Sequence, residues 1–298
     1  MQFKYYAAAL FSFIVWGCFS LVLKPLSDYA AMDILVYRVG FAAILISAFS
    51  LVFRFKITKD NINIFKYSSS IFKQKAIFHT IASAIALAFN WYLYIYVMNN
   101  VSVKATSLAY LICPILTTVI ATIFIKEKLN FWQWLAVSLS VISCIVLSLG
   151  HFMDMFYSLI IALSYAIYLV LQKINISFDK FFTLTVHILL SALMLITFGY
   201  SDSIDVIHSS LFYELVLIIA ILFTIIPLFL NMYALKGLSS SLVGVLLYIN
   251  PIIAFLLAIL YFGETVTLSQ ALAYSLIMIA VVLFNLAYLV KSKNPRTT

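Results

Sequence analysis

Apolar runs of roughly 20 residues recur along this chain and occupy most of its length. They lie at 5–24, 34–53, 76–98, 105–125, 131–149, 155–172, 183–200, 212–235, 240–262 and 269–290. A run of this length spans the hydrocarbon core of a bilayer as a helix, and a helix satisfies its own backbone hydrogen bonds there. With 65% hydrophobic and 9% charged residues, the chain has too little charge to cover such a surface in water. The sequence therefore predicts an all-α membrane protein with ten transmembrane helices.

The basic residues give these helices a direction. Fifteen of the 18 fall on one side: Lys4, Arg54, Lys56, Lys59, Lys66, Lys73, Lys75, Lys126, Lys128, Lys173, Lys180, Lys236, Lys291, Lys293 and Arg296. Connections rich in Lys and Arg stay in the cytoplasm, so we expect this side and both termini to be cytoplasmic. The asymmetry also accounts for the net charge of +8, and no nucleic-acid partner is expected.

The two halves of the chain match each other at a fixed offset. A shift of 137 residues places Pro114 on Pro251, Glu127 on Glu264 and Gln133 on Gln270. Each Pro is followed by an apolar run, a Glu and a further apolar run. We therefore expect two five-helix repeats, at 1–150 and 151–298.

An odd number of spans places the two repeats in opposite orientation. The charges agree, because the 54–75 connection carries six basic residues and its counterpart at 201–211 carries none. Inverted repeats are typical of secondary transporters, in which two mirrored halves open one central site to alternate sides.

Several short motifs resemble the drug/metabolite transporter superfamily, in particular the EamA permeases of the RarD type. They are Trp16-Gly17, Met32 to Val39 with Arg38, Asn90-Trp91 to Asn99-Asn100, Tyr110 to Pro114, Glu127 to Val137 with Gln133, Ile226-Pro227, and Tyr248 to Pro251 leading to Glu264. The chain departs from the pattern at Lys126, where Gly is usual, and at Cys113, where Asn is common. The resemblance implies ten helices, a bacterial inner (plasma) membrane location and transport of small metabolites, whose identity varies widely among relatives.

Polar and aromatic residues near the middle of the spans are candidates for a substrate site, because polar groups are costly at that depth. The candidates are Trp16, Asn90, Trp91, Tyr110, Tyr165, Asn231, Tyr248 and Asn250. Each Asn could equally join helices by hydrogen bonds, and each aromatic residue could serve packing. Proline removes a helical hydrogen bond, so we expect hinges at Pro114, Pro227 and Pro251.

Three basic residues at or inside helix ends are candidates for gating or charge pairing. Arg38, one turn inside its span, could snorkel, pair with Asp28 or Asp33, or attract an anionic group of the cargo, and we favour the pair. Lys24 and Lys173 end their helices, where snorkelling is the default and a gate the alternative.

Glu127 and Glu264 are expected to begin the fifth and tenth helices and to complement the helix dipoles there. The alternative role for these two carboxylates is proton coupling.

The function predicted from these features is secondary transport, as a permease or exporter of a small polar or amphipathic metabolite, by alternating access. The main alternative is an intramembrane lipid-modifying enzyme, which would need a catalytic cluster that the motifs do not provide, and a structural or receptor-like role would not need mirrored halves. We therefore expect no enzyme activity, no catalytic residues, no cofactor and no metal site. The expected partners are a small-molecule substrate and the bilayer; the sequence does not indicate an oligomeric state.

Overall fold

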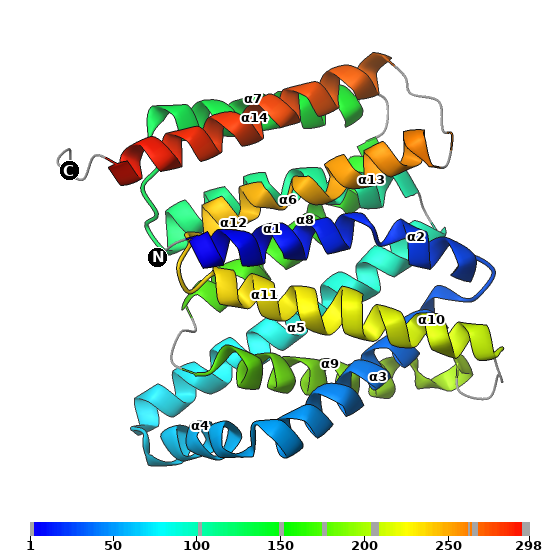
Figure 1. Ribbon diagram of the computed structural model, residues 1–298, viewed down its shortest axis with the longest axis vertical. Helices are drawn as coiled ribbons and strands as arrows, with labels where there is room; N and C mark the ends of the chain where they lie inside the picture. The colour runs from blue at the N-terminus through cyan, green and yellow to red at the C-terminus, as the bar shows by residue number, and fades with distance from the viewer. Residues whose placement is uncertain are drawn as a thin grey trace.

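The computed structural model describes residues 3–100, 103–148, 152–174, 178–203, 209–261, 263 and 268–293. These residues form helices and connections, and no β-strand occurs among them. Figure 1 shows the helices lying side by side as a bundle, most of them along one common direction. The predicted all-helical class is confirmed.

The helices follow the predicted apolar runs closely. The first half contains α1 (Phe3–Gly17), α2 (Ser20–Leu23), the single turn η1 (Lys24–Leu26), α3 (Ala31–Phe53), α4 (Phe55–Tyr67), α5 (Ser70–Asn100), α6 (Val103–Phe124) and α7 (Phe131–Ser148). The second half contains α8 (Phe152–Ile174), α9 (Lys180–Ser203), α10 (Ser210–Ala220), η2 (Ile221–Ile225), α11 (Ile226–Ala234), α12 (Ser240–Leu246), α13 (Ile249–Leu260) and α14 (Leu268–Lys293). Five described segments are long and apolar enough to cross a membrane, and five further apolar segments are shorter. The chain is a multi-pass membrane protein.

Residues 55–67 of the connection at 54–75 differ from the prediction, which treated the whole connection as a loop. They form α4, with basic side chains interleaved among apolar ones. Such a helix places apolar side chains on one face and charges on another, and this pattern suits the surface of a bilayer. The basic residues that begin at Arg54 correctly predicted where the preceding span, α3, ends, but they did not indicate the helix α4.

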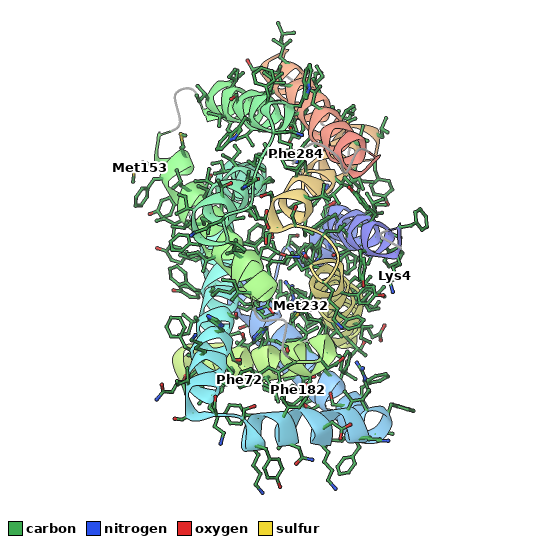
Figure 2. The ribbon with its side chains drawn as sticks, turned by 90° about the vertical axis from the view of Figure 1, so that its left-hand side faces the viewer. Lys4, Phe72, Met153, Phe182, Met232 and Phe284 are labelled. Carbon is green, nitrogen blue, oxygen red and sulfur yellow. The ribbon has the colours of Figure 1, made fainter. Side chains whose placement is uncertain are left out.

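The helix ends gather into two groups. In Figure 1, α1 begins, α14 ends and α4 lies at the left, whereas α2 and the start of α10 lie at the right. We call the left the Lys173 end and the right the Tyr29 end, after residues at the end of α8 and in the connection before α3. Figure 2 shows the side chains that fill the space between helices, with Met232 and Phe284 among those almost fully buried.

One residue in the α6–α7 connection adopts a backbone conformation that favours glycine. Lys126 has φ of 58°, in the left-handed region, which costs a residue with a Cβ about 1–2 kcal/mol. We expect Lys126→Gly to raise the free energy of unfolding by about 1 kcal/mol, measured as a higher melting temperature in detergent.

Lys128→Gly is the matched control, since Lys128 is equally exposed and has no positive φ. We expect this control to be neutral or destabilising. Equal effects of the two substitutions would contradict the strain assigned to Lys126.

Candidate functional site

Breaks in three of the apolar segments lie near the middle of the bundle. The first separates α1 from α2, the second is the wide turn η2 between α10 and α11, and the third separates α12 from α13. Pro227 follows η2 and has no N–H for the carbonyl of Phe223, four residues earlier. The indole N–H of Trp16 donates to this carbonyl at 2.9 Å. The breaks therefore supply polar backbone groups where side chains of other helices can reach them.

A cavity of about 610 Å³ adjoins these breaks. Its volume lies in the usual range for small-molecule sites. Six of the eight predicted substrate-binding residues line it: Trp16, Asn90, Trp91, Tyr110, Tyr165 and Asn250. The lining also includes Lys24 and Ser27, which are exposed, so the cavity continues toward the Tyr29 end. Both halves of the chain contribute to it, through α1, α3, α5 and α6 in the first half and α8, η2, α11 and α13 in the second.

Arg38 lines this cavity from α3. Its Nε donates to the Thr224 hydroxyl at 2.7 Å, and its guanidinium carbon lies 5.3 Å from the Trp91 ring centroid and 5.6 Å from that of Phe19. No described carboxylate forms an ion pair with it. The favoured pairing with Asp28 or Asp33 is therefore not seen among the described residues.

The three predicted asparagines have different surroundings. Asn90 Nδ2 donates to the Ile161 carbonyl at 2.9 Å and to the Ser164 hydroxyl at 3.1 Å, so it joins α5 to α8. Asn231 Nδ2 donates to the Tyr165 hydroxyl at 3.1 Å and lies outside the cavity. Asn250 lines the cavity with 8% of its surface exposed, and its side chain has no hydrogen-bond partner among the described residues. Asn250 is thus the amide best placed to bind a substrate.

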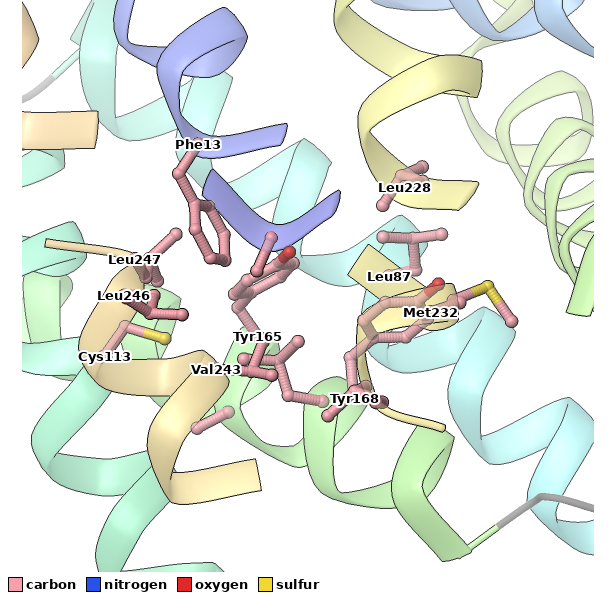
Figure 3. Close-up of a cluster of buried hydrophobic side chains, with 14 of the residues drawn as sticks. Phe13, Leu87, Cys113, Tyr165, Tyr168, Leu228, Met232, Val243, Leu246 and Leu247 are labelled. Carbon is pink, nitrogen blue, oxygen red and sulfur yellow. The ribbon is translucent and has the colours of Figure 1, made fainter. Parts of the chain in front are cut away.

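Tyr165 separates the cavity from a buried apolar layer. Figure 3 shows it between Phe13 and Leu246 on one side and Leu228 and Met232 on the other, with Tyr168 on the side of Met232. The two tyrosine rings lie 5.9 Å apart at 27°. This layer closes the cavity toward the Lys173 end.

Tyr248 lies elsewhere, although it was a substrate-binding candidate. It is 1% exposed and lies in a separate small void together with Pro114, Ser140 and Phe284. This position fits packing against α7 and α14.

The three predicted hinges also differ. Pro227 follows η2, and Pro251, which lines the cavity, lies in the first turn of α13 just after a break. Pro114 lies inside α6, which continues from Val103 to Phe124 without a break. The expected hinge at Pro114 is therefore not seen, since α6 absorbs the missing hydrogen bond within one helix.

Two charged side chains hold the chain together at the Lys173 end. Lys173 Nζ donates to the carbonyls of Leu235 and Leu238, at 2.8 and 2.6 Å. Glu127 accepts from the backbone N–H of Ser240 at 2.7 Å and from the backbone N–H and hydroxyl of Ser241 at 3.1 and 2.6 Å. We call Glu127, Lys173 and residues 235–241 the polar latch.

The hydrogen bonds of Glu127 differ from those predicted for it. This residue precedes α7 and complements the first turn of α12 instead of the start of its own helix. Glu264 lies outside the described residues. Lys24, the third gating candidate, is exposed where the cavity reaches the Tyr29 end.

Sequence reasoning missed several lining residues. Tyr94 follows Asn90 by one helical turn, so helical spacing from Asn90 would have found it. Thr224, which accepts a hydrogen bond from the lining residue Arg38, was missed as well. Its only sequence signal is its place three residues before Pro227, because the wide turn of η2 directs it toward Arg38. Among the described residues, no group of three or more His, Cys, Asp or Glu could hold a metal ion.

Solved structures and curated proteins resemble this chain over most of its length. A crystal structure titled only as that of a protein superposes with a TM-score of 0.74 at 12% identity, over 96% of this chain and 98% of its own, and so shares its fold. An uncharacterized transporter, YojE of Bacillus subtilis, is 30% identical over 92% of this chain and 90% of its own. Protein RarD of Escherichia coli is 29% identical over 93% and 92%.

The family comparison covers nearly the whole sequence. The profile of the EamA-like transporter family matches residues 3–149 and again residues 153–286. This chain therefore belongs to the EamA-like transporter family.

Proposed function

We propose that this protein is a secondary transporter that moves a small polar or amphipathic metabolite across the bacterial inner membrane by alternating access. The observation that carries the proposal is a mid-bundle cavity that continues to exposed residues at one end and is closed at the other by an apolar layer and the polar latch. A site that opens to one side while the other is closed is what alternating access requires. The printed names of the relatives, a transporter and RarD, agree with this role.

Two inverted five-helix repeats, 1–150 and 151–298, are the arrangement that we propose for the ten apolar segments. The family profile matches once in each half. Lys126 and Gly263, separated by the 137-residue offset, both have positive φ, at 58° and 67°. A shared backbone conformation at matched positions supports a common origin for the two connections.

The proposed orientation places the Lys173 end in the cytoplasm. The basic residues of α4 lie there together with Lys173 and Lys236 of the polar latch, as positive charge does on the cytoplasmic side. The conformation described would then be open outward.

Transport itself is tested by loading purified protein into proteoliposomes and following a panel of labelled metabolites under imposed gradients. Profiling of cells and medium, with and without the gene, chooses the panel. We expect at least one metabolite to cross chemically unchanged. Conversion of a lipid or solute without net movement would favour the enzyme alternative, and no movement under any gradient would overturn the proposal.

Two asparagine substitutions separate binding from packing. Asn250→Ala is expected to lower transport while leaving the melting temperature unchanged, because its amide has no partner to lose among the described residues. Asn90→Ala removes two interhelical bonds and is expected to lower both transport and the free energy of unfolding, the latter by about 1 kcal/mol.

Asn63→Ala, on α4 and away from the cavity, is the control and should change neither quantity. Full transport by both cavity variants would remove the cavity from the proposed path.

A further inference from the structure

The charged residues that line the cavity are all of one sign. Among the described residues lining it, Lys24 and Arg38 are basic and none is acidic. Lys24 is exposed at the Tyr29 end, whereas Arg38 projects from within α3, where its side chain is only partly accessible. The described lining therefore places a positive charge, that of Arg38, inside the bundle with no acidic residue of that lining to balance it.

Most of the Arg38 hydrogen-bonding capacity is unused by the described residues. A guanidinium has five N–H donors, and within the described part of the chain only Nε–H is donated, to Thr224. Thr224 is itself fixed, since its hydroxyl donates to the Ile219 carbonyl at 3.1 Å in the wide turn of η2. The Nη groups thus keep the paired geometry that suits a carboxylate or another planar oxyanion.

An isolated cation at this depth is expensive once water is excluded. Water entering from the Tyr29 end can hydrate Arg38 in the conformation described. Closure of that end would remove this water, and a bound anion would then replace it as the partner of the charge. The substrate itself is the simplest source of that anion.

The other residues that line the cavity indicate what the remainder of an anionic substrate would look like. Trp16, Trp91, Tyr110 and Tyr165 supply aromatic surface, and Asn250 supplies one amide without a protein partner among the described residues. Ring faces suit an apolar or aromatic group, and the amide suits a second polar atom.

We propose that the cavity binds a small organic carboxylate with an apolar or aromatic body, held by the Arg38 Nη groups and oriented by Asn250. The inference rests on the proposed function, because it names the substrate class of the same cavity. It excludes amines as good ligands, since no carboxylate among the described lining residues would receive them.

Binding to the purified full-length protein in detergent tests this assignment. The probes are phenylacetate, its neutral isostere phenylacetamide, and the cation phenethylamine. Trp16 and Trp91 line the cavity and report binding by fluorescence, and the other two tryptophans, Trp132 and Trp134, are exposed on α7. We expect phenylacetate to bind at least about tenfold more tightly than either other probe.

Variants at one basic position inside the cavity and one outside it make the test specific. Arg38→Gln is expected to weaken phenylacetate binding at least about tenfold and to leave phenylacetamide binding unchanged. The phenylacetate affinity of Arg38→Lys should lie between those of the unaltered protein and Arg38→Gln, because Lys keeps the charge but lacks the paired N–H donors of the guanidinium. Lys75→Gln, at an exposed position on α5 outside the cavity lining, is the matched control and should leave phenylacetate binding unchanged. Size-exclusion elution and melting temperature confirm that each variant is folded.

The outcomes separate this inference from the proposed function. Equal binding of acid and amide, unchanged acid binding by folded Arg38→Gln, or binding of none of the three probes would overturn the carboxylate assignment. Transport of only neutral or cationic solutes would overturn it while leaving the transporter proposal standing. Arg38-dependent binding of phenylacetate without transport of any solute would support the assignment and contradict the proposed function.

Discussion

Replacing Glu127 with Gln is expected to open the Lys173 end of the bundle. The carboxylate accepts three hydrogen bonds from Ser240 and Ser241, and hydrogen bonds to a charged group contribute about 1.5–3 kcal/mol each. Gln has one acceptor oxygen in place of two and carries no charge. A loss of about 2 kcal/mol shifts the balance between closed and open forms by about thirtyfold.

The shift is measured at Met232, which is 1% exposed in the apolar layer between the cavity and the latch. Met232→Cys is introduced after Cys18, Cys113 and Cys144 are changed to Ala. An impermeant maleimide applied from the cytoplasmic side should label it slowly when Glu127 is present and much faster in the Glu127→Gln variant.

Glu214→Gln makes the same chemical change at an exposed position on α10, at the Tyr29 end, and serves as the control. Labelling of Met232→Cys in this control should be as slow as in the protein that keeps both Glu127 and Glu214. A latch variant that labelled no faster than this control would show that Glu127 does not hold the closed end.

Enlarging Gly17 is expected to destabilise the contact between α1 and α13. A Cβ at Gly17 would lie 2.6 Å from the Ile253 Cβ and 3.2 Å from the Asn250 carbonyl oxygen. These neighbours belong to α13, so α1 and α13 must separate at the wall of the cavity. We expect Gly17→Ala to lower the free energy of unfolding by about 1–3 kcal/mol, seen as a lower melting temperature in detergent.

Gly40→Ala is the matched control for this change. It lies within α3, and a Cβ there would meet nothing within 4 Å. Since Ala favours a helix over Gly by up to about 1 kcal/mol, this variant should be neutral or more stable. If both alanine variants had the same melting temperature, close packing of α1 on α13 would not be needed.

The sequence was most informative about the apolar segments. Long hydrophobic runs have few alternatives in a bilayer, so helix positions could be predicted to within a few residues. The cavity residues were largely predictable too, since Trp16, Asn90 and Asn250 stand out as polar or amphipathic side chains at mid-depth.

What could not be predicted depends on contacts between distant segments. Arg38 had a plausible carboxylate nearby in the sequence, but helix α3 carries its side chain toward η2 and Thr224 instead. Glu127 reaches across to α12, more than 100 residues away, which no local pattern encodes. Tyr248 and Asn250 are two residues apart, yet a break in the helix sends one into packing and the other to the cavity.

Access to the cavity from the two sides of the membrane tests alternating access most directly. Ala254 lines the cavity from α13 and is partly exposed, so Ala254→Cys in the same cysteine-free background reports whether a thiol reagent can enter. With the latch intact, we expect labelling from the outer side alone. With Glu127→Gln, labelling from the cytoplasmic side should appear while outer labelling falls. Equal labelling from both sides with the latch intact, or an unchanged pattern in the variant, would contradict alternating access through this cavity.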